Sequence, residues 1–220
     1  MQDLIKQEQF ELEILDKLNT SKMLNYVIFG GGTMLRLCFG LNRFSVDLDF
    51  WLAKQVDEKE LLNDLKDYLT VDYTIKDYAN KFNTILFEIS SVDYPRNLKI
   101  EIRKKVQMAT EQAIAYSPHS NKQVLVNIIP LKEMMKTKIE AFLNRKEIRD
   151  VFDMEFLLKK GIRLPEEKDI LERVLKEIDL LSKKDYSVKL GSLLEARQRN
   201  YYKDNNFRVL RLAIQEQLED

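Results

Sequence analysis

The sequence predicts an α+β fold in which a region of mixed strands and helices is followed by a helical bundle. Only 6 of the 220 residues are Gly and 4 are Pro, which argues against an all-β protein with many tight turns. The composition, 45% hydrophobic and 33% charged, is that of a globular chain, and its many Leu, Lys and Glu residues favour helix. Strand-like apolar runs stop near Pro130, where segments of helical period take over. We therefore expect an α+β domain over residues 1–130 and a helical domain over residues 131–220.

Helices and strands are expected to alternate in the first part of the chain. Residues 4–18 carry apolar side chains at helical spacing, and residues 26–29 form a short apolar run that ends in three consecutive glycines. This pattern predicts a helix, a buried strand and a tight turn. A helix over 33–39, a strand over 47–52 and an amphipathic helix over 58–69 follow.

The remaining elements separate into strands and then helices. Four runs rich in β-branched and aromatic residues predict strands over 71–78, 83–90, 98–106 and 124–128. Beyond Pro130, helical periodicity predicts helices over 131–143, 148–160, 166–181, 188–197 and 206–218.

Charge and cysteine content limit the classes of function. The 36 basic and 36 acidic residues cancel, so the total charge gives no sign of nucleic-acid binding. Two stretches are locally basic: residues 99–105 have four bases and one acid, and residues 132–149 have six bases and three acids. These stretches either hold a polyanion or are ordinary solvated faces. The single cysteine, Cys38, excludes an internal disulfide.

No targeting or membrane signal is found in the sequence. Its first ten residues lack the basic-then-apolar pattern of a secretion signal. No segment approaches the roughly 20 apolar residues of a membrane span. We expect a soluble, cytoplasmic protein with no membrane partner.

The glycines before Thr33 form a candidate phosphate-binding turn. Gly31 and Gly32 allow close approach of the backbone to a phosphate, and the helix that follows presents free N–H groups and a partial positive charge. Thr33 adds a hydroxyl donor. A plain tight turn is the alternative. The segment is not a P-loop, because no Gly-Lys-Ser/Thr follows at the required spacing.

The segment Asp47-Leu48-Asp49-Phe50 is a candidate metal site. Side chains two residues apart in a strand point to the same face, so Asp47 and Asp49 would lie together while Leu48 and Phe50 face a core. Two neighbouring carboxylates repel each other unless a cation lies between them, and Mg²⁺ prefers such oxygen ligands. A solvated edge strand is the alternative.

At this spacing, the glycine turn and the Asp47/Asp49 pair together indicate a nucleotide-binding site more specifically than either feature does alone. Thirteen residues, from Met34 to Val46, separate Thr33 from Asp47. That length fits a helix and a loop, which would let the two strands lie side by side. A bound triphosphate could then touch both the glycines and the carboxylates.

With these motifs the sequence resembles the polymerase-β-like nucleotidyltransferase superfamily and, more narrowly, the AbiEii/AbiGii toxin family. The resemblance covers residues 29–158 and rests on three motifs in family order: Gly31-Gly32-Thr33-Met34-Leu35; Arg43-Phe44-Ser45-Val46-Asp47-Leu48-Asp49-Phe50; and a helical block with Lys138-Ile139-Glu140-Ala141, Arg145, Arg149-Asp150 and Asp153. It implies a mixed sheet with helices, followed by a helical bundle that contributes Lys138 and Asp150 to the site.

The resemblance also implies roles for individual residues. Asp47 and Asp49 would bind two Mg²⁺ ions, with Mn²⁺ as a substitute. Gly31, Gly32 and Thr33 would hold the triphosphate, with Arg43 and Ser45 of the second motif also binding nucleotide. Lys138 would neutralise phosphate charge, and Asp150 would support or orient that lysine and the nucleotide. Glu101 is the best candidate for a third carboxylate on a later strand.

The activity implied is transfer of a nucleoside monophosphate from an NTP to an acceptor, with release of pyrophosphate. For this family the acceptor is often the tRNA 3′ end or another RNA, and the enzyme is the toxin of a toxin–antitoxin or abortive-infection system with a cognate antitoxin. Two other classes remain open from the residues alone. One is an enzyme of a different kind with an Asp-x-Asp motif, above all a sugar-nucleotide glycosyltransferase. The other is a non-catalytic nucleotide-binding or partner-docking module.

Overall fold

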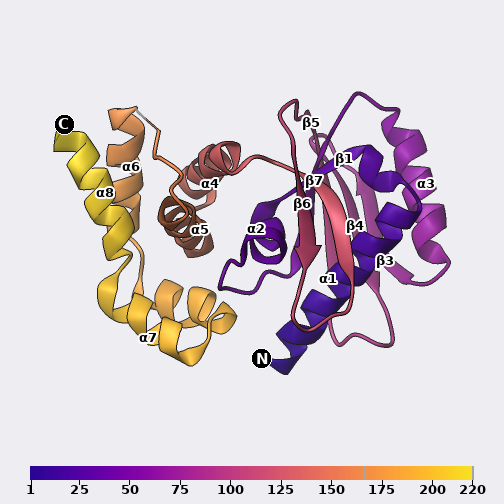
Figure 1. The fold of residues 1–220 in the computed structure, drawn as a ribbon, viewed down its shortest axis with the longest axis horizontal. Helices are drawn as coiled ribbons and strands as arrows, with labels where there is room; N and C mark the ends of the chain where they lie inside the picture. The colour runs from indigo at the N-terminus through magenta and orange to yellow at the C-terminus, as the bar shows by residue number, and fades with distance from the viewer. Residues whose placement is uncertain (166, 220) are drawn as a thin grey trace. The chain divides into compact units, whose positions relative to one another are not determined.

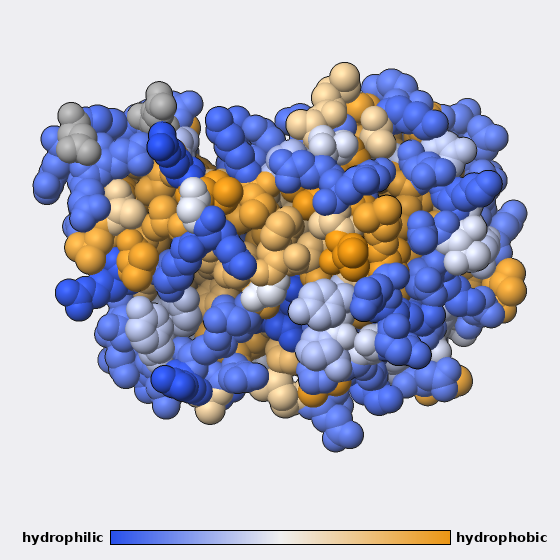
Figure 2. All heavy atoms as spheres, in the orientation of Figure 1, coloured by the Kyte–Doolittle hydropathy of each residue, from blue (hydrophilic) through white to orange (hydrophobic). Residues whose placement is uncertain are grey.

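A computed structural model of the protein describes residues 1–165 and 167–219 (Figure 1). Contacts between Cα atoms divide the chain into two compact units, Met1–Pro130 and Leu131–Asp220. Within the described residues, no helix is both long enough and apolar enough to cross a lipid bilayer. Hydrophilic residues cover much of the face seen in Figure 2, in keeping with the high charge content of the sequence.

A mixed sheet forms the centre of the N-terminal unit, as predicted. Over the described residues it has seven strands in the order β3-β4-β5-β2-β1-β7-β6. The strands β1 and β2 pair antiparallel, whereas β2 pairs parallel with β5 and β1 pairs parallel with β7. The strand bounds are Val27–Gly30 (β1), Asp47–Leu52 (β2), Thr74–Asn80 (β3), Thr84–Ser90 (β4), Leu98–Val106 (β5), Glu111–Tyr116 (β6) and Gln123–Ile128 (β7).

Helices α1 (Gln2–Thr20) and α3 (Glu58–Thr70) cover one face of this sheet, and Figure 1 shows both on the same side. Leu18 of α1 and Leu65 of α3 line a small gap together with Phe50 and Ile100 of the sheet. Burial of each such side chain contributes roughly 1.5–3 kcal/mol. Because side chains alternate along β2, burial of Phe50 directs Asp49 to the opposite face.

Two predictions for the sheet region need correction. Strand β6 was not predicted, because its sequence, Glu-Gln-Ala-Ile-Ala-Tyr, contains little of the β-branched pattern of a strand. It forms by antiparallel pairing with β7 along its whole length. The predicted strand over 71–78 begins only at Thr74, since Val71 and Asp72 form the turn after α3.

The C-terminal unit is helical, as predicted. Its α-helices are α4 (Leu131–Arg145), α5 (Ile148–Lys159), α6 (Lys168–Asp179), α7 (Ala196–Asn205) and α8 (Arg208–Glu219). Phe142, Phe152 and Phe207 are fully buried in this unit. Residue 166, where one predicted helix begins, lies outside the described residues.

The predicted helix over 188–197 is wrong. A π-helical segment, Asp185–Leu190, and a 3-10 turn, Gly191–Leu193, come first, and α7 starts at Ala196 after Leu194 adopts an extended conformation. Gly191 is a poor helix former, and this weakens the local preference for a continuous helix.

Candidate active site

The end of β1 meets the carboxylate strand β2 at Gly31. Gly30 pairs with Asp49 in the antiparallel register, and Gly31 follows with φ +74°. A Cβ atom added to Gly31 would lie 2.2 Å from Oδ2 of Asp49, so only glycine leaves room for this carboxylate. The glycine bend therefore lies directly against Asp49, one of the two acids that were predicted to lie near it.

Gly31 and Gly32 are part of the first turn of helix α2 (Gly31–Phe39), which begins two residues earlier than predicted. Gly30 is the N-cap and offers no side chain to the N–H groups of that turn. The start of α2 thus combines uncapped N–H groups with the positive end of the helix dipole. This arrangement suits an anion such as phosphate.

Thr33 is fully buried, and its hydroxyl donates a hydrogen bond of 2.5 Å to the main-chain oxygen of Asp47. This bond ties the first turn of α2 to the first residue of β2. In this structure Thr33 thus positions the carboxylate strand.

Arg43 and Ser45 converge on Gly32. A Cβ atom added to Gly32 would lie 2.5 Å from Nη2 of Arg43 and 2.9 Å from Oγ of Ser45. Arg43 is buried, and its Nη1 donates to the main-chain oxygen of Phe44 at 2.9 Å. The two predicted nucleotide-binding side chains therefore lie against the start of α2, close to the glycines.

Glu101 lies beside Asp49 in the parallel register between β2 and β5. Residues in register on adjacent strands share a face, so Glu101 joins Asp47 and Asp49 on one side of the sheet. All three are partly exposed. Within residues 1–165 and 167–219, however, no group of three or more His, Cys, Asp or Glu side chains is close enough to hold a metal ion.

Helix α1 contacts the main chain before the carboxylate strands through polar residues that were not predicted as site residues. Gln7 is fully buried, and its Nε2 donates to the main-chain oxygens of Val46, at 3.2 Å, and Asn97, at 3.3 Å. Gln7 thereby links the residues that precede β2 and β5. The sequence signal was its place on the buried stripe of α1, since Gln7 and Glu11 continue the helical spacing of Leu4 and Leu15.

Glu11 is a second buried polar residue of α1. It is fully buried, and neither carboxyl oxygen has a hydrogen-bond partner among the described residues. Burial raises the pKa of Glu11 well above its ordinary value, and the nearby Glu8 and Asp47 act in the same direction, while Arg36 opposes them. The folded protein therefore favours a neutral Glu11.

The predicted residues of the C-terminal unit form a buried ionic cluster. Nζ of Lys138 lies 2.6 Å from Oδ2 of Asp153 and 3.4 Å from Oδ1 of Asp150. Arg145 binds Asp150 with two parallel hydrogen bonds of 2.7 Å. Both aspartates are fully buried, and Lys138 is only 5% exposed. Asp153 is thus the closer partner of Lys138, and Asp150 lies between Lys138 and Arg145.

The family model that describes the nucleotidyl transferase AbiEii toxin of type IV toxin–antitoxin systems matches residues 13–217. The chain belongs to the AbiEii nucleotidyl transferase family. This result agrees with the resemblance found in the sequence motifs.

Two solved structures share the fold of this AbiEii protein. The crystal structure of JHP933 from Helicobacter pylori aligns with a TM-score of 0.58 and 20% identity, covering 96% of this chain and 95% of that chain. A candidate nucleotidyltransferase from H. pylori aligns with the same TM-score and identity over 94% and 96% of the two chains. The comparison with curated proteins gives no match.

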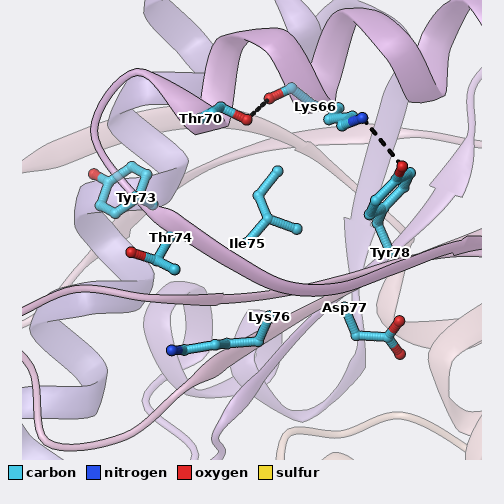
Figure 3. Close-up of a pocket in the computed structure, with 8 residues that line it drawn as sticks. All are labelled: Lys66, Thr70, Tyr73, Thr74, Ile75, Lys76, Asp77 and Tyr78. Carbon is cyan, nitrogen blue, oxygen red and sulfur yellow. Dashed lines mark hydrogen bonds between the residues drawn. The ribbon is translucent and has the colours of Figure 1, made fainter.

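A separate pocket of about 600 Å³ lies between α3 and the edge strand β3 (Figure 3). Lys66 donates a 3.1 Å hydrogen bond to the hydroxyl of Tyr78 across it. Its lining residues are Lys66, Thr70, Tyr73, Thr74, Ile75, Lys76, Asp77 and Tyr78, and none of them is a predicted site residue. The candidate active site of the N-terminal unit is therefore the face that carries Asp47 and Asp49.

Proposed function

We propose that this AbiEii protein transfers a nucleoside monophosphate from an NTP to an acceptor hydroxyl, with pyrophosphate as the second product. The observation that carries the proposal is the contact between Gly31 and Asp49 at the start of α2. It joins an anion-binding helix start to a carboxylate strand, which are the two parts that a metal-bound triphosphate requires.

Asp47 and Asp49 are proposed to bind two Mg²⁺ ions, and Mn²⁺ is an alternative. The residues fit this role, because carboxylate oxygens on one face of a strand are the ligands that Mg²⁺ prefers. Bound ions would supply charge stabilisation to the attacking oxygen and to the leaving pyrophosphate. Glu101 is proposed as the third carboxylate of this face.

Several neutral and cationic groups would hold the nucleotide. The uncapped N–H groups of Gly31 and Gly32 receive the triphosphate, and Arg43 and Ser45 support the nucleotide from the loop before β2. Lys138 is proposed to neutralise phosphate charge and Asp150 to keep it oriented. In the reaction the acceptor oxygen forms a bond to the α-phosphorus, the bond to the β-phosphate oxygen breaks, and the acceptor proton passes to a base, for which Glu101 is the candidate.

The acceptor is proposed to be RNA, with the 3′ end of tRNA as the first candidate. The support is the family, which is described as the toxin of a type IV toxin–antitoxin system. Modification of an RNA needed for translation would stop growth. We accordingly propose a cytoplasmic toxin that is counteracted by a cognate antitoxin.

The test is incubation of the protein with each labelled NTP, Mg²⁺ and total tRNA. We expect label on RNA for one or more NTPs, and a loss of at least about 100-fold for Asp49→Asn, because metal binding contributes several kcal/mol to transition-state stabilisation. The matched control is Asp64→Asn on the exposed side of α3, which should keep full activity.

Other outcomes would point to other functions. Label that persists in Asp49→Asn rules out the metal assignment. Tight NTP binding without transfer or growth arrest indicates a binding module, and tight binding of a sugar nucleotide indicates a glycosyltransferase.

A further inference from the structure

Arg103 of β5 lies on the same face of the sheet as the carboxylates. The parallel register pairs Asp49 with Glu101 and Trp51 with Arg103, so all four side chains leave the sheet on one side. Along β2, Trp51 is only about 7 Å beyond Asp49. An arginine side chain can span that distance.

Trp51 brings this arginine close to the glycine bend. A Cβ atom added to Gly30 would lie 2.5 Å from the Trp51 ring, so the indole fills the space above a residue that has no side chain. Gly30 pairs directly with Asp49 and precedes Gly31. The guanidinium carbon of Arg103 lies 4.7 Å from the centroid of the Trp51 ring, a cation–π contact that orients the planar group.

The charge of Arg103 is not neutralised by a neighbouring acid. Among residues 1–165 and 167–219, the side chain of Arg103 makes no hydrogen bond or ion pair, although it is only partly exposed. Its neighbour Lys104 points the other way and binds Glu58 at the start of α3, at 2.6 Å. Lys99, in register with Asp47, also leaves the sheet on the carboxylate face but is exposed, whereas Arg103 is held in a fixed orientation against Trp51.

We propose that Arg103, supported by Trp51, is a phosphate-binding residue of the carboxylate face, an inference that rests on the proposed nucleotidyl transfer. A guanidinium with a fixed plane and available N–H donors suits bidentate binding of phosphate oxygens. The phosphate belongs either to the polyphosphate tail of the nucleotide or to the backbone of an RNA acceptor.

Two binding measurements separate these sources. Calorimetry measures the binding of tripolyphosphate in the presence of Mg²⁺, which reports on the nucleotide tail. The affinity for total tRNA at several salt concentrations reports on the acceptor. Arg103→Met keeps the bulk against Trp51 but removes the charge. This variant should weaken the affinity for either tripolyphosphate or tRNA by about tenfold or more. For tRNA, the slope of log K against log salt should also fall by about one.

The matched control is Arg96→Met, in the exposed turn before β5, which should change neither affinity. Arg103→Gln is a second neutral variant, and circular dichroism shows which variants are folded. Unchanged affinity for both probes in a folded Arg103 variant overturns this inference but leaves the proposed transfer intact. Failure of the wild-type protein to bind either probe overturns the proposed function and this inference together.

Discussion

Two charged regions, the surroundings of Asp49 and Glu11 in the N-terminal unit and the ionic cluster of the C-terminal unit, accommodate their charges in different ways. In the N-terminal unit, Asp49 occupies space that exists because Gly31 has no side chain, and the buried Glu11 favours its neutral form. In the C-terminal unit, the buried Lys138, Asp150 and Asp153 and the more exposed Arg145 form a cluster in which two cations meet two anions. The first arrangement depends on shape, and the second depends on charge balance. Mutations around Asp49 should therefore act through the space available to its side chain, whereas mutations in the C-terminal cluster should act through the loss of charge balance.

The largest effect on stability is expected from breaking the C-terminal cluster. Lys138→Met leaves Asp153 buried without its 2.6 Å partner, and loss of one member of a buried ion pair costs about 3–5 kcal/mol. Urea unfolding measures the change. The double variant Lys138→Met/Asp153→Leu should recover a large part of the loss, because no buried charge of the pair then remains. Equal destabilisation of the single and double variants would contradict the importance of charge balance.

Two glycines of the N-terminal unit have nearly the same φ angle but different surroundings. Gly31 and Gly40 have φ values of +74° and +75°, but an added Cβ meets Asp49 at Gly31 and nothing within 4 Å at Gly40. Gly40→Ala should cost only the backbone strain, about 1–2 kcal/mol. Gly31→Ala should cost more and should also abolish most nucleotidyl transfer, because the carboxylate must move.

Thermal melts and the transfer assay measure the two glycine variants side by side. Equal losses of stability and of activity in both variants would show that the space around Asp49 does not determine which residue is tolerated at position 31. Asp49 would then not differ from the C-terminal ionic cluster in the way proposed above, in which the first depends on available space and the second on charge balance.

A pH-dependent effect is expected from Glu11, whose charge is removed by protonation rather than by a partner. Its pKa is raised in the folded protein above the ordinary value of 4.5, so the folded chain holds a proton that the unfolded chain releases. The wild-type free energy of unfolding should lose about 1.4 kcal/mol per pH unit from this group as pH rises above 4.5, until the folded pKa is reached.

Glu11→Gln carries no titrating proton, so it should lack this contribution and gain stability relative to wild type as pH rises. Urea unfolding at a series of pH values measures the difference between the two proteins. The exposed Glu60→Gln on α3 is the control and should follow wild type at every pH. A difference between Glu11→Gln and wild type that does not change with pH would show that burial of Glu11 does not favour its neutral form.

Much of the N-terminal fold followed from local pattern. The strand Asp47–Leu52 was predicted with its observed bounds, because acids alternate with apolar residues there. The start of α2 was less accurate, since glycine signals a bend without showing that the bend is already helical. Strand β6 was missed because its pairing with β7, and not its own composition, makes it a strand.

In the candidate site, too, some residues could be predicted from local pattern and others could not. Asp47, Asp49 and the glycines were recognised from motif and spacing. Gln7 and Glu11 were not recognised, because a polar residue on an apolar stripe gains meaning only when its partners are known. Both precede residue 13, where the match to the family model begins.

By itself, the sequence determined which residues carry acid, glycine and lysine chemistry and which face of β2 the acids occupy, because strand periodicity is a local property of the chain. Only the tertiary structure decided that Asp49 lies against Gly31, that Glu101 and Arg103 lie beside β2, and that Lys138 is held between two aspartates. These contacts depend on strand pairing and helix packing between distant segments, and the pattern within any one segment does not specify which partner it meets.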